Sequence, residues 1–248
     1  MKFVVCVNHV PDTETKVKIG ADGKTIDRAG VNFILNPYDE FAIEAALKMK
    51  EKFGGETYVV TLGGDAHKET LRKSLAMGID KAVYLKDDAV RDSYAVAFAL
   101  ADELKKMAPD AVFFGKQSID YYGEQVPGLV AEMMGLPSIS VVVKLDVQDK
   151  KVVCEREIEG GHEVVEGSLP IVISAQKGLN EPRYPSLKGI MSAKTKPIEE
   201  HPAAACASKV EVLSMTKPAA KQAGKIVGTD ASAVPELVRL LHEEAKVI

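Results

Sequence analysis

Two glycine-containing turns carry the side chains in this sequence that are best suited to binding a phosphorylated ligand. Leu62-Gly63-Gly64 follows one strand-like segment, and Gly115-Lys116-Gln117-Ser118 follows another. Glycine lets a ligand approach the backbone closely, and the second turn adds a cation, a carboxamide and a hydroxyl that suit phosphate and adenine. However, the sequence has neither the GxGxxG nor the Walker A pattern, and glycine turns end many strands. Spacing alone leaves a nucleotide site and ordinary turns as equal alternatives.

The other reactive side chains form no recognisable catalytic or metal-binding pattern. Asp120 could act as a general base, hold a ribose hydroxyl or cap the helix that follows, and these roles stay open. The cysteines match neither a CxxC pair nor a zinc spacing, and no histidine is spaced to pair with a nucleophile. These residues are Cys6, Cys154, Cys206, His9, His67, His162, His201 and His242. We therefore expect no catalytic residue and no metal site.

The composition is that of an ordinary globular protein. Hydrophobic residues make up 46% of the chain and charged residues 27%, and the formal net charge is -4. That charge argues against binding to nucleic acid, which requires an excess of lysine and arginine. No apolar run approaches the roughly 18 residues that a membrane span needs, and the N-terminus leads directly into a strand-like segment. We expect a cytoplasmic protein.

Alternating strand-like and helix-like segments position the two turns. Strands are expected at 3–7, 57–61, 82–85 and 111–114, with helices at about 36–52, 65–78, 92–107 and 126–134. This alternation predicts an α/β fold with a doubly wound, mostly parallel sheet. Such sheets bind ligands beyond the carboxyl ends of their strands. Both turns, and the residues that follow Cys6, would lie there.

The second half of the sequence follows a different pattern. Segments 141–147, 151–158 and 163–165 predict an antiparallel extension, and 171–175 predicts a return strand. Residues 180–191 contain two prolines and a short helical tail, which indicates an exposed loop. Residues 197–208 resemble a linker, and apolar residues at helical spacing predict an amphipathic helix over 232–246. That helix needs something to pack against.

One long motif resembles a known protein family. The run LNEPRYPSLKGIM at 179–191 is similar to the signature of electron transfer flavoprotein beta subunits. Further matches are CVNHVPD at 6–12, NPYDE at 36–40, LAMG at 75–78, GKQSID at 115–120 and EREI at 155–158. In order and spacing, these matches cover nearly the whole chain.

The resemblance implies an electron carrier rather than an enzyme, with an adenine nucleotide alpha hydrolase-like, Rossmann-type fold. It implies a heterodimer with an alpha subunit that holds most of an FAD, while the beta subunit binds AMP. We expect a nucleotide-binding domain over 1–200, then a linker and a C-terminal arm over 201–248 that packs on the alpha subunit. The matching cofactor-binding positions are Cys6, Asn36, Pro37, Tyr38, Asp39, Leu62, Gly115, Lys116, Gln117, Ser118, Ile119, Asp120, Tyr121, Tyr122, Gly123, Glu124, Gln125 and Val126.

The resemblance also implies two redox partners. Family members accept electrons from acyl-CoA dehydrogenases, as in fatty acid beta-oxidation, and pass them to a membrane quinone oxidoreductase. A loop at about 179–196 recognises the dehydrogenase through an anchoring leucine, and Leu187 matches that leucine. The alternative is that Leu187 is an ordinary leucine packed within its own chain. The matching recognition residues are Tyr184, Pro185, Ser186, Leu187, Lys188, Ile190 and Met191.

The nucleotide segment departs from the family patterns. Three segments are similar to those of electron-bifurcating members, which hold a second FAD and oxidise NADH. These segments are Gln125-Val126, residues 10–13 and residues 185–188. Tyr121 and Tyr122 instead replace small or acidic residues where a second FAD would lie, which favours AMP and simple electron carriage. Bifurcation is the first alternative, and a stand-alone nucleotide-binding sensor domain is the second.

Overall fold

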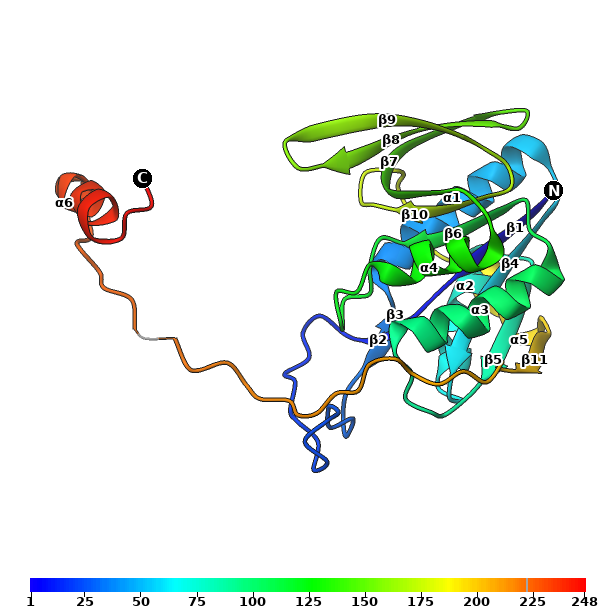
Figure 1. The fold of residues 1–248 in the computed structure, drawn as a ribbon, viewed down its shortest axis with the longest axis horizontal. Coiled ribbons are helices and arrows are strands. Elements are labelled where there is room, and N and C mark those ends of the chain that lie inside the picture. The colour runs from blue at the N-terminus through cyan, green and yellow to red at the C-terminus, as the bar shows by residue number, and fades with distance from the viewer. Residues whose placement is uncertain (222) are drawn as a thin grey trace. The chain divides into compact units, whose positions relative to one another are not determined.

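The computed structural model describes residues 1–221 and 223–248, which form two compact units (Figure 1). The larger unit spans Met1–Leu213 and the smaller one Ser214–Ile248. The larger unit contains the sheet. In the described parts of the chain, no helix is long and apolar enough to cross a membrane.

A nine-stranded sheet forms the centre of the larger unit, with the strand order β11-β5-β4-β1-β6-β10-β7-β8-β9. The pairs from β11 to β7 are parallel, while β7-β8 and β8-β9 are antiparallel. The strands are β1 (Lys2–Cys6), β4 (Glu56–Gly63), β5 (Lys81–Lys86), β6 (Ala111–Gly115), β7 (Ser138–Gln148), β8 (Lys151–Ile158), β9 (Gly161–Ser168), β10 (Ile171–Ala175) and β11 (Ile198–Pro202). The predicted α/β sheet with an antiparallel extension is confirmed.

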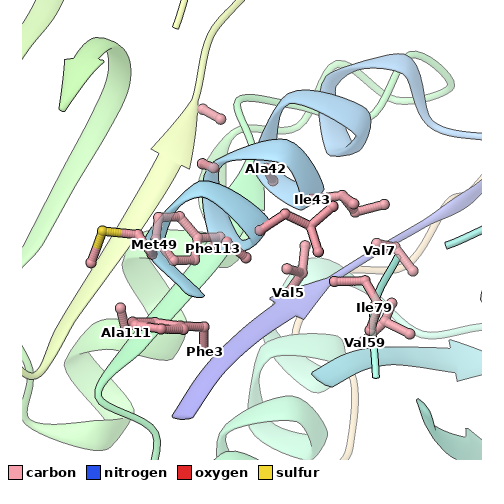
Figure 2. Close-up of a cluster of buried hydrophobic side chains, with 14 of the residues drawn as sticks. Phe3, Val5, Val7, Ala42, Ile43, Met49, Val59, Ile79, Ala111 and Phe113 are labelled. Atoms are coloured by element: carbon pink, nitrogen blue, oxygen red, sulfur yellow. The ribbon is translucent and has the colours of Figure 1, made fainter. Parts of the chain in front are cut away.

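Helices cover both faces of this sheet. The helices α1 (Pro37–Phe53), α2 (His67–Met77) and α5 (Leu187–Thr195) lie on one face, and α3 (Ser93–Met107) and α4 (Gln125–Met134) on the other. Alternate strand residues point to opposite faces, so Phe3 and Val5 pack under α1 while Val4 packs under α3. Figure 2 shows Ala42, Ile43 and Met49 of α1 over the strand residues. The doubly wound architecture therefore has two separate cores.

The helix ends follow the expected signals. Pro37 opens α1, and Asp92 caps α3 by accepting a hydrogen bond from the Ala95 N–H at 2.8 Å. Gly78 ends α2 and Gly135 ends α4, both with positive φ. All four helices of the first half lie within a few residues of their predicted bounds.

Two features differ from the sequence prediction. A small antiparallel pair, β2 (His9–Pro11) and β3 (Phe33–Leu35), was not predicted because three-residue strands carry little periodic signal. The predicted linker over 197–208 is wrong for residues 198–202, which form β11 and pair in parallel with β5. Only alternate residues of an edge strand meet the core, so a strand with three charged or polar residues resembles a linker in sequence.

The smaller unit has one short helical segment near its C-terminal end. It contains a 3₁₀ turn, η1 (Ala231–Ala233), then α6 (Val234–Arg239) and a π-helical turn, η2 (Leu240–Glu244). The predicted C-terminal helix is therefore present. Val234, Leu237 and Val238 are exposed, and Arg239 forms ion pairs with nearby glutamates.

Candidate functional site

The parallel part of the sheet has a switch point between β1 and β6. From β1 the chain proceeds to β4 and β5 on one side, and then crosses to β6 on the other side of β1. In α/β folds, the loops that leave such strands diverge and ligands bind at the carboxyl ends of the strands. We use the word crevice for this switch point. Cys6 ends β1 and Gly115 ends β6, so two of the predicted cofactor-binding residues flank this crevice.

Asp39 is the central side chain of the crevice. It is buried in the first turn of α1, and its carboxylate accepts hydrogen bonds from the Asn8 N–H at 2.7 Å and the Gly115 N–H at 3.1 Å. The Asn36 side chain donates a third bond at 2.9 Å. A Cβ atom at Gly115 would lie 2.3 Å from an Asp39 oxygen, so only glycine fits there. Asp39 thus joins the ends of β1, β6 and α1.

Asn36 extends the same network into the loop after β6. Its Nδ2 also donates to the Gln117 carbonyl at 2.9 Å, and its Oδ1 accepts from the Ile119 N–H at 3.3 Å. Asparagine is one of the residues that most often cap a helix through the side chain. Asn36 does occupy the N-cap position, but its side chain is engaged with the loop instead. The loop over 116–124 is therefore fixed to the start of α1.

Burial controls the ionisation of the two groups beside the crevice. Burial raises the pKa of Asp39 to about 7, while the hydrogen bonds from Asn8, Asn36 and Gly115 oppose that rise. Burial, and then the Asp39 carboxylate, raise the pKa of the Cys6 thiol. Cys6 is therefore a protonated, inert thiol rather than a nucleophile.

The loop over 116–124 places several predicted residues at the surface. The Lys116 ammonium lies 3.5 Å from the Glu124 carboxylate, and Tyr122 has a left-handed φ of 52°. The side chains of Tyr121 and Tyr122 are 77% and 68% exposed in this chain. The exclusion of a second FAD by these two rings stays a prediction.

The N-terminus of α4 faces this loop. The helix begins at Gln125 with Glu124 at the N-cap position, so Asp120 lies too far upstream to cap it. Instead, Asp120 accepts a hydrogen bond from the Tyr121 N–H at 2.9 Å. Among the described residues, none caps α4 with its side chain. The first-turn amides, including those of Gln125 and Val126, are the groups that bind phosphate at helix N-termini.

The other predicted turn has a structural role. Leu62 is partly buried and packs into the core under α3, and a Cβ at Gly63 would lie 2.3 Å from the His67 ring. His67 lies 4.9 Å from His9, centroid to centroid, and His9 forms a 2.8 Å hydrogen bond with Thr70. Sequence spacing could not indicate this histidine pair, because the fold brings β2 and α2 together.

The segment 183–191 forms the second predicted site, and we call it the docking segment. Its start is fixed to α1, because Arg183 Nε and Nη2 donate to Glu44 at 2.7 and 2.9 Å. The Glu44 side chain is only 4% exposed. Leu187 is 83% exposed, so the ordinary packed-leucine alternative is wrong for this chain. Tyr184 and Met191 are also exposed.

Reciprocal contacts hold α5 against α2. Ser186 caps α5 by accepting from the Gly189 N–H at 3.0 Å, and a Cβ at Gly189 would lie 2.4 Å from the Ala76 carbonyl oxygen. Arg72 of α2 donates to the Ala193 carbonyl near the end of α5, at 2.6 Å. Lys196, just after α5, donates to the Ile79 carbonyl beyond α2, also at 2.6 Å. The docking segment is therefore held rigidly, against α1 at its start and against α2 along α5.

The fold and the crevice define a doubly wound α/β protein with a Rossmann-like architecture. A family model described as "Electron transfer flavoprotein domain" matches residues 23–206. The chain is a member of the electron transfer flavoprotein family, as a beta subunit. It is 45% identical to the electron transfer flavoprotein subunit beta of Syntrophomonas wolfei, over 90% of this chain and 88% of that protein.

Other relatives show the same relationship. The electron transfer flavoprotein subunit beta of Bacillus subtilis is 40% identical, with full coverage of both chains. The caffeyl-CoA reductase-Etf complex subunit CarD of Acetobacterium woodii is 39% identical, over 98% of this chain and 99% of that protein. Membership in this family assigns electron transfer to the chain, together with an alpha-subunit partner and association with flavin.

Proposed function

We propose that this chain is the beta subunit of a one-FAD electron carrier that accepts electrons from acyl-CoA dehydrogenases and passes them to a membrane quinone oxidoreductase. The exposed Leu187 on a rigidly held segment is the observation that carries the proposal. Leu187 lies in a group of exposed apolar side chains with Tyr184 and Met191, and such groups mark interaction sites. Pre-ordering of the segment lowers the entropy cost of docking. The flavin, when bound, accepts two electrons and releases them singly.

The test of this proposal is the variant Leu187→Ala in the complete heterodimer. The rate at which a reduced acyl-CoA dehydrogenase reduces the heterodimer should fall by about fivefold to a hundredfold, because an anchoring leucine contributes roughly 1–3 kcal/mol. The flavin content should stay unchanged. Val164→Ala, in the exposed strand β9 at the far edge of the sheet, is the matched control. Equal rates for the two variants would refute the docking role.

We also propose that the crevice beside Asp39 binds AMP. The amides at the start of α4 would hold the phosphate, and Gln117, Ser118 and Lys116 lie in the loop that the Asn36 side chain fixes. The alpha subunit would hold most of the FAD and would cover the apolar face of α6, the helix of the C-terminal arm. Nucleotides released from the denatured heterodimer can be separated and quantified. We expect one FAD and one AMP per heterodimer.

A second candidate is a subunit of an electron-bifurcating complex with a second FAD in the same crevice. The similarity to CarD of the caffeyl-CoA reductase-Etf complex supports it, as do the exposed positions of Tyr121 and Tyr122. Two FAD molecules and no AMP per heterodimer, with reduction by NADH, would establish this candidate and refute the first.

A further inference from the structure

A groove of about 560 Å³ lies beside the docking segment. Phe33, Ile34 and Leu35 of β3 line one side, and residues of α2 and α5 line the others, including Ile190. Ile190 belongs to the docking segment, so the groove is continuous with the surface that carries Leu187. An apolar hollow next to an exposed apolar anchor is typical of an interface that extends beyond the anchor.

The exposed face of α5 connects the two features. Leu187, Ile190, Met191 and Lys194 follow one another at the spacing of one helix face, and all four are exposed. A helix in a globular protein usually turns its apolar stripe towards the core, whereas α5 packs on α2 through small residues such as Gly189 and Ala193. The exposed apolar stripe of α5 therefore ends at Lys194, which is a cation at the rim of the groove.

The charge around the groove indicates the chemistry of the occupant. Arg72 and Lys73 also line the groove, but Arg72 binds carbonyl groups and Lys73 pairs with Glu40 at 2.6 Å. Within the described part of the chain, Lys194 forms no ion pair, and Glu69 is the one acidic lining residue. Because the carbonyl groups leave the Arg72 charge uncompensated, the lining carries a net positive charge, although the whole chain carries a net charge of -4. Such a rim favours a partner with carboxylates.

We propose that this groove receives an apolar side chain, flanked by carboxylates, from the protein that docks on Leu187. The inference rests on the proposed docking function and makes recognition reciprocal, because Leu187 enters the partner while the partner enters the groove. Lys194 would then pair with a partner carboxylate at the edge of the contact, where charge mainly affects the association rate.

The experiment uses the complete heterodimer and a purified acyl-CoA dehydrogenase kept reduced by its acyl-CoA substrate. Ile34→Asp would place a carboxylate in the groove, and Lys194→Glu would reverse the rim charge. Each variant should raise the KM for the dehydrogenase by about three- to tenfold with little change in kcat. The Lys194→Glu effect should vanish at about 1 M salt, where charges are screened within roughly 3 Å.

Conservative variants and a distant lysine serve as controls. Ile34→Val and Lys194→Arg should keep the wild-type KM, and so should Lys105→Glu, because Lys105 is exposed on α3 at the opposite face of the sheet. Thermal unfolding and flavin content would reveal any variant that is misfolded. A misfolded Ile34→Asp would leave the Lys194 series, with its salt dependence, as the deciding measurement.

The outcomes separate the two proposals. If Leu187→Ala weakens electron acceptance but Ile34→Asp and Lys194→Glu do not, the groove inference is wrong and the docking function stands. If the groove variants act alone, the anchor role of Leu187 is wrong while the groove remains an interface. Loss of the alpha subunit or of flavin from correctly folded groove variants would place the alpha subunit in the groove and overturn the inference.

Discussion

The ion pair between Arg183 and Glu44 provides the sharpest test of how the docking segment is held. Arg183→Met keeps most of the side-chain volume but removes the two guanidinium bonds to the buried Glu44 carboxylate. Breaking a buried ion pair costs about 3–5 kcal/mol. Because the Arg183 side chain is 37% exposed, water can partly replace it, and we expect a loss of about 2–3 kcal/mol.

A second pair offers an internal comparison. Arg183 also donates to Glu51 at 2.8 Å, but the Glu51 side chain is 58% exposed. Glu51→Gln should therefore cost less than about 0.5 kcal/mol. The double variant Arg183→Met with Glu44→Met should be more stable than Arg183→Met alone, since no charge would remain buried without a partner.

Urea unfolding of the heterodimer at one fixed concentration measures these differences. Hydrogen exchange at the amides of α5 then shows whether the loss is local to the docking segment. If Arg183→Met and Glu51→Gln cost the same, or if the double variant is no more stable than Arg183→Met alone, the burial argument is refuted.

Three further predictions concern the crevice and the surrounding helices. Gly115→Ala would press a methyl group against Asp39, so thermal unfolding should show a loss of about 2–4 kcal/mol, and an unchanged Tm would contradict this. Gly189→Ala would press against the Ala76 carbonyl and should speed hydrogen exchange in α5 while the rest of the sheet stays protected; unchanged exchange in α5 would refute the close contact. Burial lowers the pKa of His67 to about 4 from 6.5, so its protonation favours the unfolded state as the pH falls below about 6.5. Between about pH 7.5 and pH 5, wild type should lose about 1–2 kcal/mol more unfolding free energy than His67→Gln, and parallel pH profiles would be inconsistent with that shift.

Much of the fold could be predicted because its strongest elements have clear periodicity. The apolar spacing in α4 and the proline at the start of α1 allowed both helices to be predicted. The ends of the predicted strands then indicated where the crevice would lie. The docking segment depended on a long family motif rather than on periodicity. Its exposure could be anticipated from Pro182 and Pro185, just before and within it.

The remaining features depend on contacts between distant residues. Asn36 has the residue type and position of a helix cap, and only the loop over 116–124 offers its side chain different partners. The exposure of Tyr121 and Tyr122 could not be predicted, because side-chain direction in a loop has no periodic signal. The histidine pair requires β2 beside α2, two elements that are far apart in sequence.

The late strand β11 has a consequence for the synthesis of this protein on the ribosome. Strand β5, with the sequence KAVYLK, is finished long before β11 emerges to pair with it. At a typical rate of 5–20 residues per second, the β5 edge stays open for on the order of ten seconds. An open apolar edge can pair with other nascent chains. Residues 198–202 therefore protect the edge of β5 from pairing with other chains. A chain truncated before them would leave this edge permanently unpaired and prone to aggregation.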